Sequence, residues 1–174
     1  MKTKNYLQIF FYALLIITLT MSCGSDNDSP SKEETALKEQ EAEFVKLKSI
    51  IAGEWEAYQY YNTSVYHPTG WQPISQIHWD TGYIFNSDGT YIEHSNIGDS
   101  KGTYRLEKNP TYAEWPGRKC KVFIYFKRDD YSSETKKMIW LDDDYIRLDY
   151  ATWTDQLPAD AYADGEGCIR YKKK

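Results

Sequence analysis

The chain of 174 residues is 41% hydrophobic and 27% charged, with a formal charge of −5 and a mean hydropathy of −0.71. This length suits one domain, or one domain with a tail, and a single apolar stretch excludes a polytopic membrane protein. Aromatic residues make up 16% of the chain, which excludes a wholly disordered protein because so many rings need a core. The acidic balance argues against nucleic acid as a partner, since phosphate backbones are bound by clustered Lys and Arg.

The N-terminus has the pattern of a secretory signal over residues 1–22. Lys2 and Lys4 precede an uncharged stretch that ends at Ser22 and is short for a membrane span. Removing these residues takes away two lysines and no acids, so the formal charge of −5 becomes −7. A body of this charge is repelled by anionic lipid headgroups, so membrane attachment requires a lipid.

Ser22-Cys23, directly after the apolar stretch, resembles the lipobox of bacterial lipoproteins. The resemblance implies that the leader is cut before Cys23 and that acyl chains on this residue hold the protein to a membrane. In that class, an Asp directly after the cysteine favours the inner membrane. This chain has Gly24 at that position, which implies the outer membrane. Asp26 and Asp28 resemble tags that export some lipoproteins to the cell surface. The alternative is a cysteine that merely ends an ordinary signal or an uncleaved anchor.

A polar tether and a helix are expected next. Residues 23–31 are polar and turn-forming, which is typical of a solvated linker. A helix is predicted over 32–52, because Ser31 and Glu34 fit a capping box and Gly53 provides a stop. One apolar stripe follows it, and Glu34 with Lys38 forms a supporting pair; the stripe residues are Leu37, Phe44, Leu47 and Ile51. The helix is either a spacer laid on the following domain or a coiled-coil partner, and fewer than three heptads favour the spacer.

From Trp55 onward the hydrophobic period changes to two, which predicts strands; Val122, Ile124 and Phe126, for example, share one face of their strand. Asn86-Ser87-Asp88-Gly89 is a hairpin signal, and short connections favour antiparallel neighbours. The fold class expected is all-β, a meander of about eight antiparallel strands that closes into an up-and-down barrel over 53–174 after one N-terminal helix. The predicted strands are 54–61, 77–86, 90–95, 102–107, 119–127, 136–141, 145–150 and 168–173.

Several motifs resemble lipocalin-like domains of Gram-negative lipoproteins. They are Gly53-Glu54-Trp55 at the start of the first strand, the Asp88-Gly89-Thr90-Tyr91 turn, Gly102-Thr103-Tyr104, and a last strand rich in Tyr, Arg and Lys. The resemblance implies a barrel with Trp55 closing its bottom and Arg170 packed over that ring. A clear Thr-Asp-Tyr loop, which true lipocalins carry, is missing.

The sequence offers little support for catalysis, a metal or a cofactor. His67, His78 and His94 lack the paired spacing of a zinc site, although the last two could meet across neighbouring strands. The Asp runs 129–130 and 142–144 lack the alternating oxygen ligands of a calcium loop and are typical of turns. We therefore predict no catalytic residues, no metal ligands and no cofactor, and an enzyme is the less favoured interpretation.

Cys120 and Cys168 form an even pair in an exported chain, which invites a disulfide. A strict meander places the starts of their strands at opposite ends of the barrel, too far apart for the about 7 Å that a disulfide allows. The sequence leaves both alternatives: the even pair of cysteines favours a disulfide, and the meander disfavours it.

Aromatic side chains are the candidate binding residues: Tyr66, Trp71, Trp79, Tyr91 and Tyr104. Two hypotheses follow from them. In the first, a membrane-anchored barrel binds a small apolar or amphipathic ligand inside, with the 62–76 segment as a lid. In the second, aromatic loops on a barrel with a filled core bind a glycan or a partner protein. Alternatively, rings such as Trp71 only plug the barrel or pack on the helix.

Overall fold

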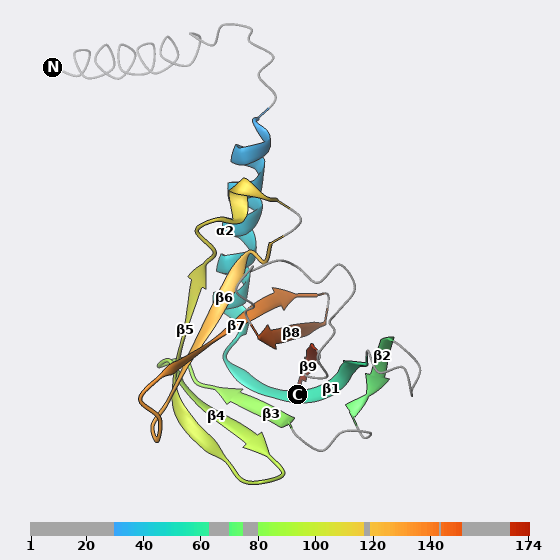
Figure 1. The fold of residues 1–174 in the computed structure, drawn as a ribbon, viewed down its shortest axis with the longest axis vertical. Helices are drawn as coiled ribbons and strands as arrows, with labels where there is room; N and C mark the ends of the chain where they lie inside the picture. The colour runs from blue at the N-terminus through green and yellow to red at the C-terminus, as the bar shows by residue number, and fades with distance from the viewer. Residues whose placement is uncertain (1–29, 63–69, 75–79, 117–118, 143, 151–167) are drawn as a thin grey trace, which may run out of the picture. The chain divides into compact units, whose positions relative to one another are not determined.

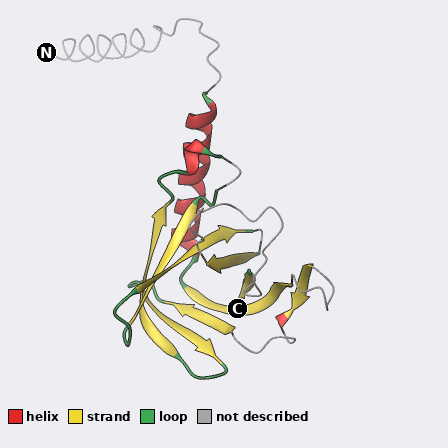
Figure 2. Cartoon of the chain, viewed as in Figure 1, coloured by secondary structure: helices red, strands yellow, loops and turns green. Residues whose placement is uncertain are grey.

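A computed structural model describes residues 30–62, 70–74, 80–116, 119–142, 144–150 and 168–174. Figure 1 labels the elements, and Figure 2 colours them by type. They are α2 (Lys32–Ile50), β1 (Gly53–Asn62), β2 (Gly70–Pro73), β3 (Asp80–Phe85), β4 (Thr90–Ser95), β5 (Ser100–Lys108), the short 3-10 helix η2 (Tyr112–Glu114), β6 (Val122–Arg128), β7 (Glu134–Leu141), β8 (Tyr145–Tyr150) and β9 (Ile169–Lys173).

The strands of the described residues form one antiparallel sheet that closes on itself. The order is β2-β1-β3-β4-β5-β6-β7-β8-β9, and β1 also pairs with β9. In that closing pair Trp55 lies opposite Lys173 and Tyr60 opposite Ile169, with a bulge between Ala57 and Gln59. Eight strands therefore make a closed barrel, and β2 is an extra strand on the C-terminal half of β1. The predicted all-β barrel after one helix is confirmed.

The predicted strands agree with the observed ones to within a few residues, with one omission. β2 lies inside the segment 62–76, which we interpreted as a loop. Its four residues, from Gly70 to Pro73, are too few to show a period, and they pair only with residues 59–62 of β1. Pro73 is tolerated because it is the last residue of an outer strand.

The barrel interior is filled by the inward residues of alternating strands. On β6 these are Val122, Ile124 and Phe126, all on the face predicted from their alternation. Tyr83 stacks on Phe85 with ring centroids 5.3 Å apart, and on Phe126 at 5.4 Å. Trp55, Tyr91 and Tyr171 belong to the same buried cluster. These rings are each 4% exposed or less, so the described interior around them is a packed core and not an empty pore.

The C-terminal end of helix α2 packs on this core through Leu47, and Ile51 directly after the helix does the same; both residues are buried. The predicted stripe is wrong at its first position, because Leu37 is 49% exposed and Ala36 is buried instead. The predicted Glu34–Lys38 pair is present at 2.7 Å. The helix ends at Ile50, three residues before Gly53, whose φ of +133° needs a glycine.

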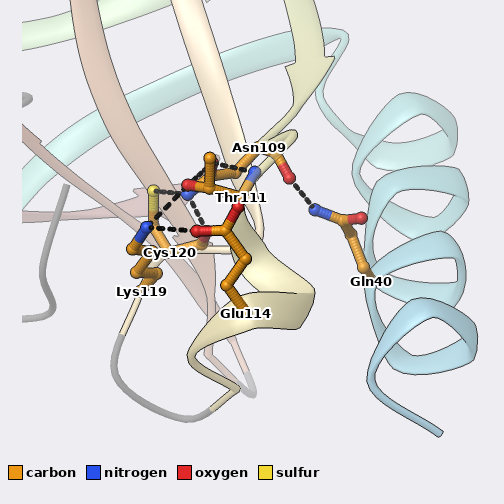
Figure 3. Close-up of polar contacts among 6 residues, drawn as sticks. All are labelled: Gln40, Asn109, Thr111, Glu114, Lys119 and Cys120. Carbon is orange, nitrogen blue, oxygen red and sulfur yellow. Dashed lines mark hydrogen bonds and ion pairs between the residues drawn. The ribbon is translucent and has the colours of Figure 1, made fainter. Parts of the chain in front are cut away.

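A buried glutamine fastens the helix to the sheet. Gln40 Nε2 donates hydrogen bonds to the backbone oxygens of Asn109, at 2.7 Å, and of Lys121, at 2.8 Å. Figure 3 shows the first of these bonds, between α2 and the connection that follows β5. Ion pairs Glu41–Lys108 and Glu43–Lys121 flank it, at 2.8 and 3.1 Å. The sequence pattern gave no signal for this clamp, since a glutamine on a helix usually faces water.

Gly102 is the position in the sheet where a side chain has least room. A Cβ there would lie 2.0 Å from the backbone oxygen of Lys127 on the neighbouring strand. We expect Gly102→Ala to lower the free energy of unfolding by about 3 kcal/mol, because backbone on both strands must move. Urea denaturation followed by tryptophan fluorescence measures it. Thr103→Ala, one residue along on the exposed face, is the control, and a loss no larger than this control's would contradict the close approach.

Candidate functional site

The outward face of β8, β9, β1 and β2 carries paired cations and aromatic rings. On β9, Ile169 and Tyr171 face the core, so Arg170 between them faces outward. On β1, Gln59 lies opposite Arg170, and Tyr61 lies opposite Trp71 of β2. Strand alternation therefore brings a residue from the C-terminus beside Trp71, far away in the sequence.

Arg170 is held between two rings. Its guanidinium carbon lies 3.7 Å from the ring centroid of Trp71 and 4.5 Å from that of Tyr145 on β8. Nη1 donates to Gln59 Oε1 at 3.2 Å, and Tyr61 meets Trp71 edge to face, with centroids 5.3 Å apart. Arginine stacks on aromatic faces in this way because its planar cation is attracted to the ring and only weakly hydrated. Arg170 thus holds the partly buried Trp71 ring in position and places a positive charge against its face.

A second arginine repeats the arrangement next to the first. Arg147 on β8 lies directly opposite Arg170 and stacks on Trp140 of β7, with its guanidinium carbon 4.3 Å from the ring centroid. Like charges directly opposite each other on adjacent strands repel. The Nε atoms of both arginines are buried without a hydrogen-bond partner, and within the described ranges neither guanidinium pairs with a carboxylate. We call the set Tyr61, Trp71, Trp140, Tyr145, Arg147 and Arg170 the outer belt.

The barrel-closing pair expected from the lipocalin resemblance differs in the structure. Trp55 is buried beneath the helix end, where its Nε1 donates to the Ile51 oxygen at 2.7 Å. The cation over its ring is Lys173 Nζ, 5.5 Å from the centroid, while Arg170 covers Trp71. The register explains this, because Lys173 is the residue opposite Trp55 and Arg170 lies opposite Gln59. Trp55 is therefore a buried core residue whose cation partner is Lys173.

Two other predicted binding residues lie inside the barrel and apart from Trp71. Tyr91 is 2% exposed and packs on Phe126, with centroids 4.9 Å apart. Burial, and then the Glu93 carboxylate, raise the pKa of Tyr91 to about 12. Tyr104 packs on Phe85 at 4.9 Å and donates its hydroxyl proton to the Asn86 oxygen at 3.0 Å. Tyr91 belongs to the core and Tyr104 packs partly buried against it, so the sequence-based grouping joined inner and outer residues.

A buried lysine faces the barrel interior and was not predicted. Lys137 is 8% exposed and donates to the Tyr83 hydroxyl at 3.1 Å, and that hydroxyl contacts Glu93. In the sequence, Lys136-Lys137 is a polar pair whose alternation with Ile139 puts the second lysine inside. This polar layer is the one interior feature of the described residues that suits an amphipathic ligand.

The remaining predicted sites either lie outside the described residues or gain no support from the structure. Cys23, Tyr66 and Trp79 lie outside the described residues. His94 Nδ1 is paired with Asp99 Oδ1 at 2.8 Å. Within the described ranges no group of His, Cys, Asp and Glu gathers in a way that could hold a metal ion, and no helix there is long and apolar enough to cross a membrane.

Cys120 and Cys168 are buried, and the structure does not join them in a disulfide. Cys168 Sγ donates to Asp149 Oδ2 at 3.1 Å, and burial together with this carboxylate raises the pKa of the thiol. We expect no mass change on reduction, and alkylation by iodoacetamide at pH 8 only after unfolding, because the thiolate is the reactive form. Mass spectrometry of the chain from residue 24 onward checks both statements. A two-dalton gain on reduction would contradict the absence of a Cys120–Cys168 disulfide.

Comparisons with known proteins add one similar structure. No protein-family model matches the chain, and no curated protein matches it. A crystal structure of a DUF4847 family protein from Bacteroides vulgatus ATCC 8482 is similar at a TM-score of 0.41 and 12% sequence identity, over 74% of this chain and 97% of that one. A likeness at this level says nothing about what this chain binds.

Proposed function

We propose that this chain is a lipid-anchored envelope protein that binds an acidic glycan on its outer belt, with the barrel as a scaffold. One observation carries the proposal: Arg147 and Arg170 lie side by side, stacked on aromatic rings, without a carboxylate partner among the described residues. Such a pair repels itself unless an anion lies between or above the two guanidinium groups.

A glycan with carboxylate or sulfate groups fits the chemistry of the belt. Guanidinium groups take up carboxylate and sulfate oxygens in bidentate fashion, and the rings of Trp71 and Tyr145, which are both partly exposed beside Arg170, are of the kind that pack on the CH face of a sugar. The net negative charge of the chain disfavours indiscriminate binding of polyanions. A local cationic pair on an acidic body therefore supports a selective site.

The other hypothesis, an apolar or amphipathic ligand inside the barrel, is supported less well. The rings of Tyr83, Phe85, Tyr91 and Phe126 fill the described interior, so a ligand at their level has to displace them. The Lys137–Tyr83–Glu93 layer is the specific feature that favours an interior ligand. That hypothesis stays a prediction with its own test.

The proposed attachment and location rest on the sequence around Cys23. We expect the Cys23 thiol to carry acyl chains and the protein to lie at the outer membrane, because Gly24 follows the cysteine. Asp26 and Asp28, close behind it, favour export to the cell surface. Incorporation of labelled palmitate into the expressed protein tests the anchor. Label that persists in Cys23→Ala would refute acylation at this residue.

Binding assays with the chain from residue 24 onward separate the two hypotheses. We expect it to bind immobilised polygalacturonate or dextran sulfate and not neutral dextran, with affinity that falls as salt rises. Titration with a hydrophobic dye and native mass spectrometry monitor the interior. A saturable dye site or a co-purified lipid, together with no binding to either polyanion, would reject the belt and favour the interior ligand.

A further inference from the structure

A pocket lies outside the barrel between helix α2, the connection from β5 to β6 and strand β7. Its volume is about 260 Å³, and the residues that line it are Glu39, Glu43, Tyr112, Pro116, Lys119, Lys121 and Trp140. We call it the helix-side pocket. Pockets for drug-sized ligands have volumes of about 300 Å³ or more, so this smaller pocket suits a single small ring.

Two buried polar atoms of this pocket have no hydrogen-bond partner. Glu43 uses Oε2 to pair with Lys121 Nζ at 3.1 Å, while its Oε1 is buried and unpaired. Trp140 is 8% exposed, and its Nε1 donor is also buried and unpaired. A buried polar group without a partner costs about 1–3 kcal/mol, so an acceptor and a donor left open beside one pocket indicate a missing partner.

The charges of the lining residues sum to zero, because two glutamates, Glu39 and Glu43, stand against two lysines, Lys119 and Lys121. Lys119 is held by Thr111 Oγ1 at 2.8 Å and Glu114 Oε2 at 3.5 Å, as Figure 3 shows. The Tyr112 hydroxyl donates to Glu39 Oε2 at 3.5 Å. Burial works to lower the pKa of Lys121, but the hydrogen bond and charge attraction to Glu43, together with Tyr112 and Glu39, outweigh it and the pKa is raised, so the lysine stays charged and paired. The pocket thus has no net demand for a charged ligand.

We propose that the helix-side pocket binds one neutral sugar ring, with one hydroxyl donating to Glu43 Oε1, another accepting from Trp140 Nε1, and the ring of Tyr112 beside the sugar's CH face. A neutral polyol supplies both hydrogen-bond donors and acceptors from one molecule, which neither an apolar ligand nor a simple ion does. This site does not depend on the acidic-glycan proposal, although Trp140 belongs to both.

Saturation-transfer difference NMR and calorimetry with neutral monosaccharides test this site. The probes are glucose, galactose, mannose and N-acetylglucosamine, added up to about 50 mM to the chain from residue 24 onward, which contains every described residue. We expect saturable binding of at least one sugar with a Kd of about 1 mM. Glu43→Gln and Trp140→Phe, the latter keeping an aromatic ring, should each weaken it about fivefold.

Two control variants make the outcome specific. Glu41→Gln changes the neighbouring exposed ion pair with Lys108, outside the pocket, and Arg170→Gln changes only the outer belt. Both should leave sugar affinity unchanged, and the thermal midpoint of each variant verifies its fold. Absence of saturable binding for all four sugars would overturn the proposal and leave water as the partner of the two atoms. Equal affinities in the four variants would overturn it as well, since binding would then lie elsewhere.

Discussion

Replacing Trp55 by alanine is expected to lower the free energy of unfolding by about 3–5 kcal/mol. The side chain is 2% exposed in the barrel core, and its Nε1 donates to Ile51 at the end of α2. The substitution therefore leaves a cavity and an unpaired carbonyl at the junction of helix and barrel. Guanidinium denaturation of the chain from residue 24 onward measures the loss.

Trp115→Ala is the matched control for this substitution, because Trp115 is 55% exposed. The same change in chemistry should there cost less than about 0.5 kcal/mol. Equal losses at the two positions would mean that Trp55 does not lie in the core, and the contact between α2 and the closing strand pair would be wrong.

Replacing both belt arginines by glutamine is expected to weaken binding to an acidic polysaccharide about 100-fold. Arg147→Gln and Arg170→Gln each remove a charged donor, worth about a factor of ten, while the glutamine keeps some of the packing on Trp140 and Trp71. Biolayer interferometry on immobilised polygalacturonate gives the affinities. Stability should change little or rise, because the two like charges no longer face each other.

Arg105→Gln is the control for the belt variants. Arg105 also stacks on a ring, Tyr125, at 4.1 Å, but it pairs with Glu107 at 2.8 Å and with Glu134. Its charge is therefore already compensated, and its loss should leave the affinity unchanged. A loss as large as that of the belt pair would indicate that net charge, rather than the paired arginines, governs binding.

The sequence was sufficient to predict the barrel because its period-two pattern and short turns act locally. Val122, Ile124 and Phe126 were placed on one inner face by alternation alone, and that face is the core. β2 was missed because its register depends only on the edge of β1, which no local pattern reveals.

The candidate site could be predicted only in part, because it depends on the closure of the sheet. Trp71 was singled out, but its contact with Arg170 arises only when β9 pairs with β1 and Gln59 meets Arg170. The resemblance to lipocalins placed Arg170 over Trp55, and the observed register gives that place to Lys173. Of the tyrosines chosen for their type, Tyr91 lies in the core and Tyr104 packs partly buried against it.

NMR of the arginine Nε–Hε groups is the most direct test of the outer belt as the binding surface. An oligogalacturonate titrated into the ¹⁵N-labelled chain from residue 24 onward should shift the signals of Arg147 and Arg170, whose Nε atoms are unpaired in the structure. The signal of Arg105 and the inner methyl groups of Leu148 and Ile139 should stay in place. Shifts of the inner methyl groups with unchanged arginine signals would contradict the belt and put the ligand inside the barrel.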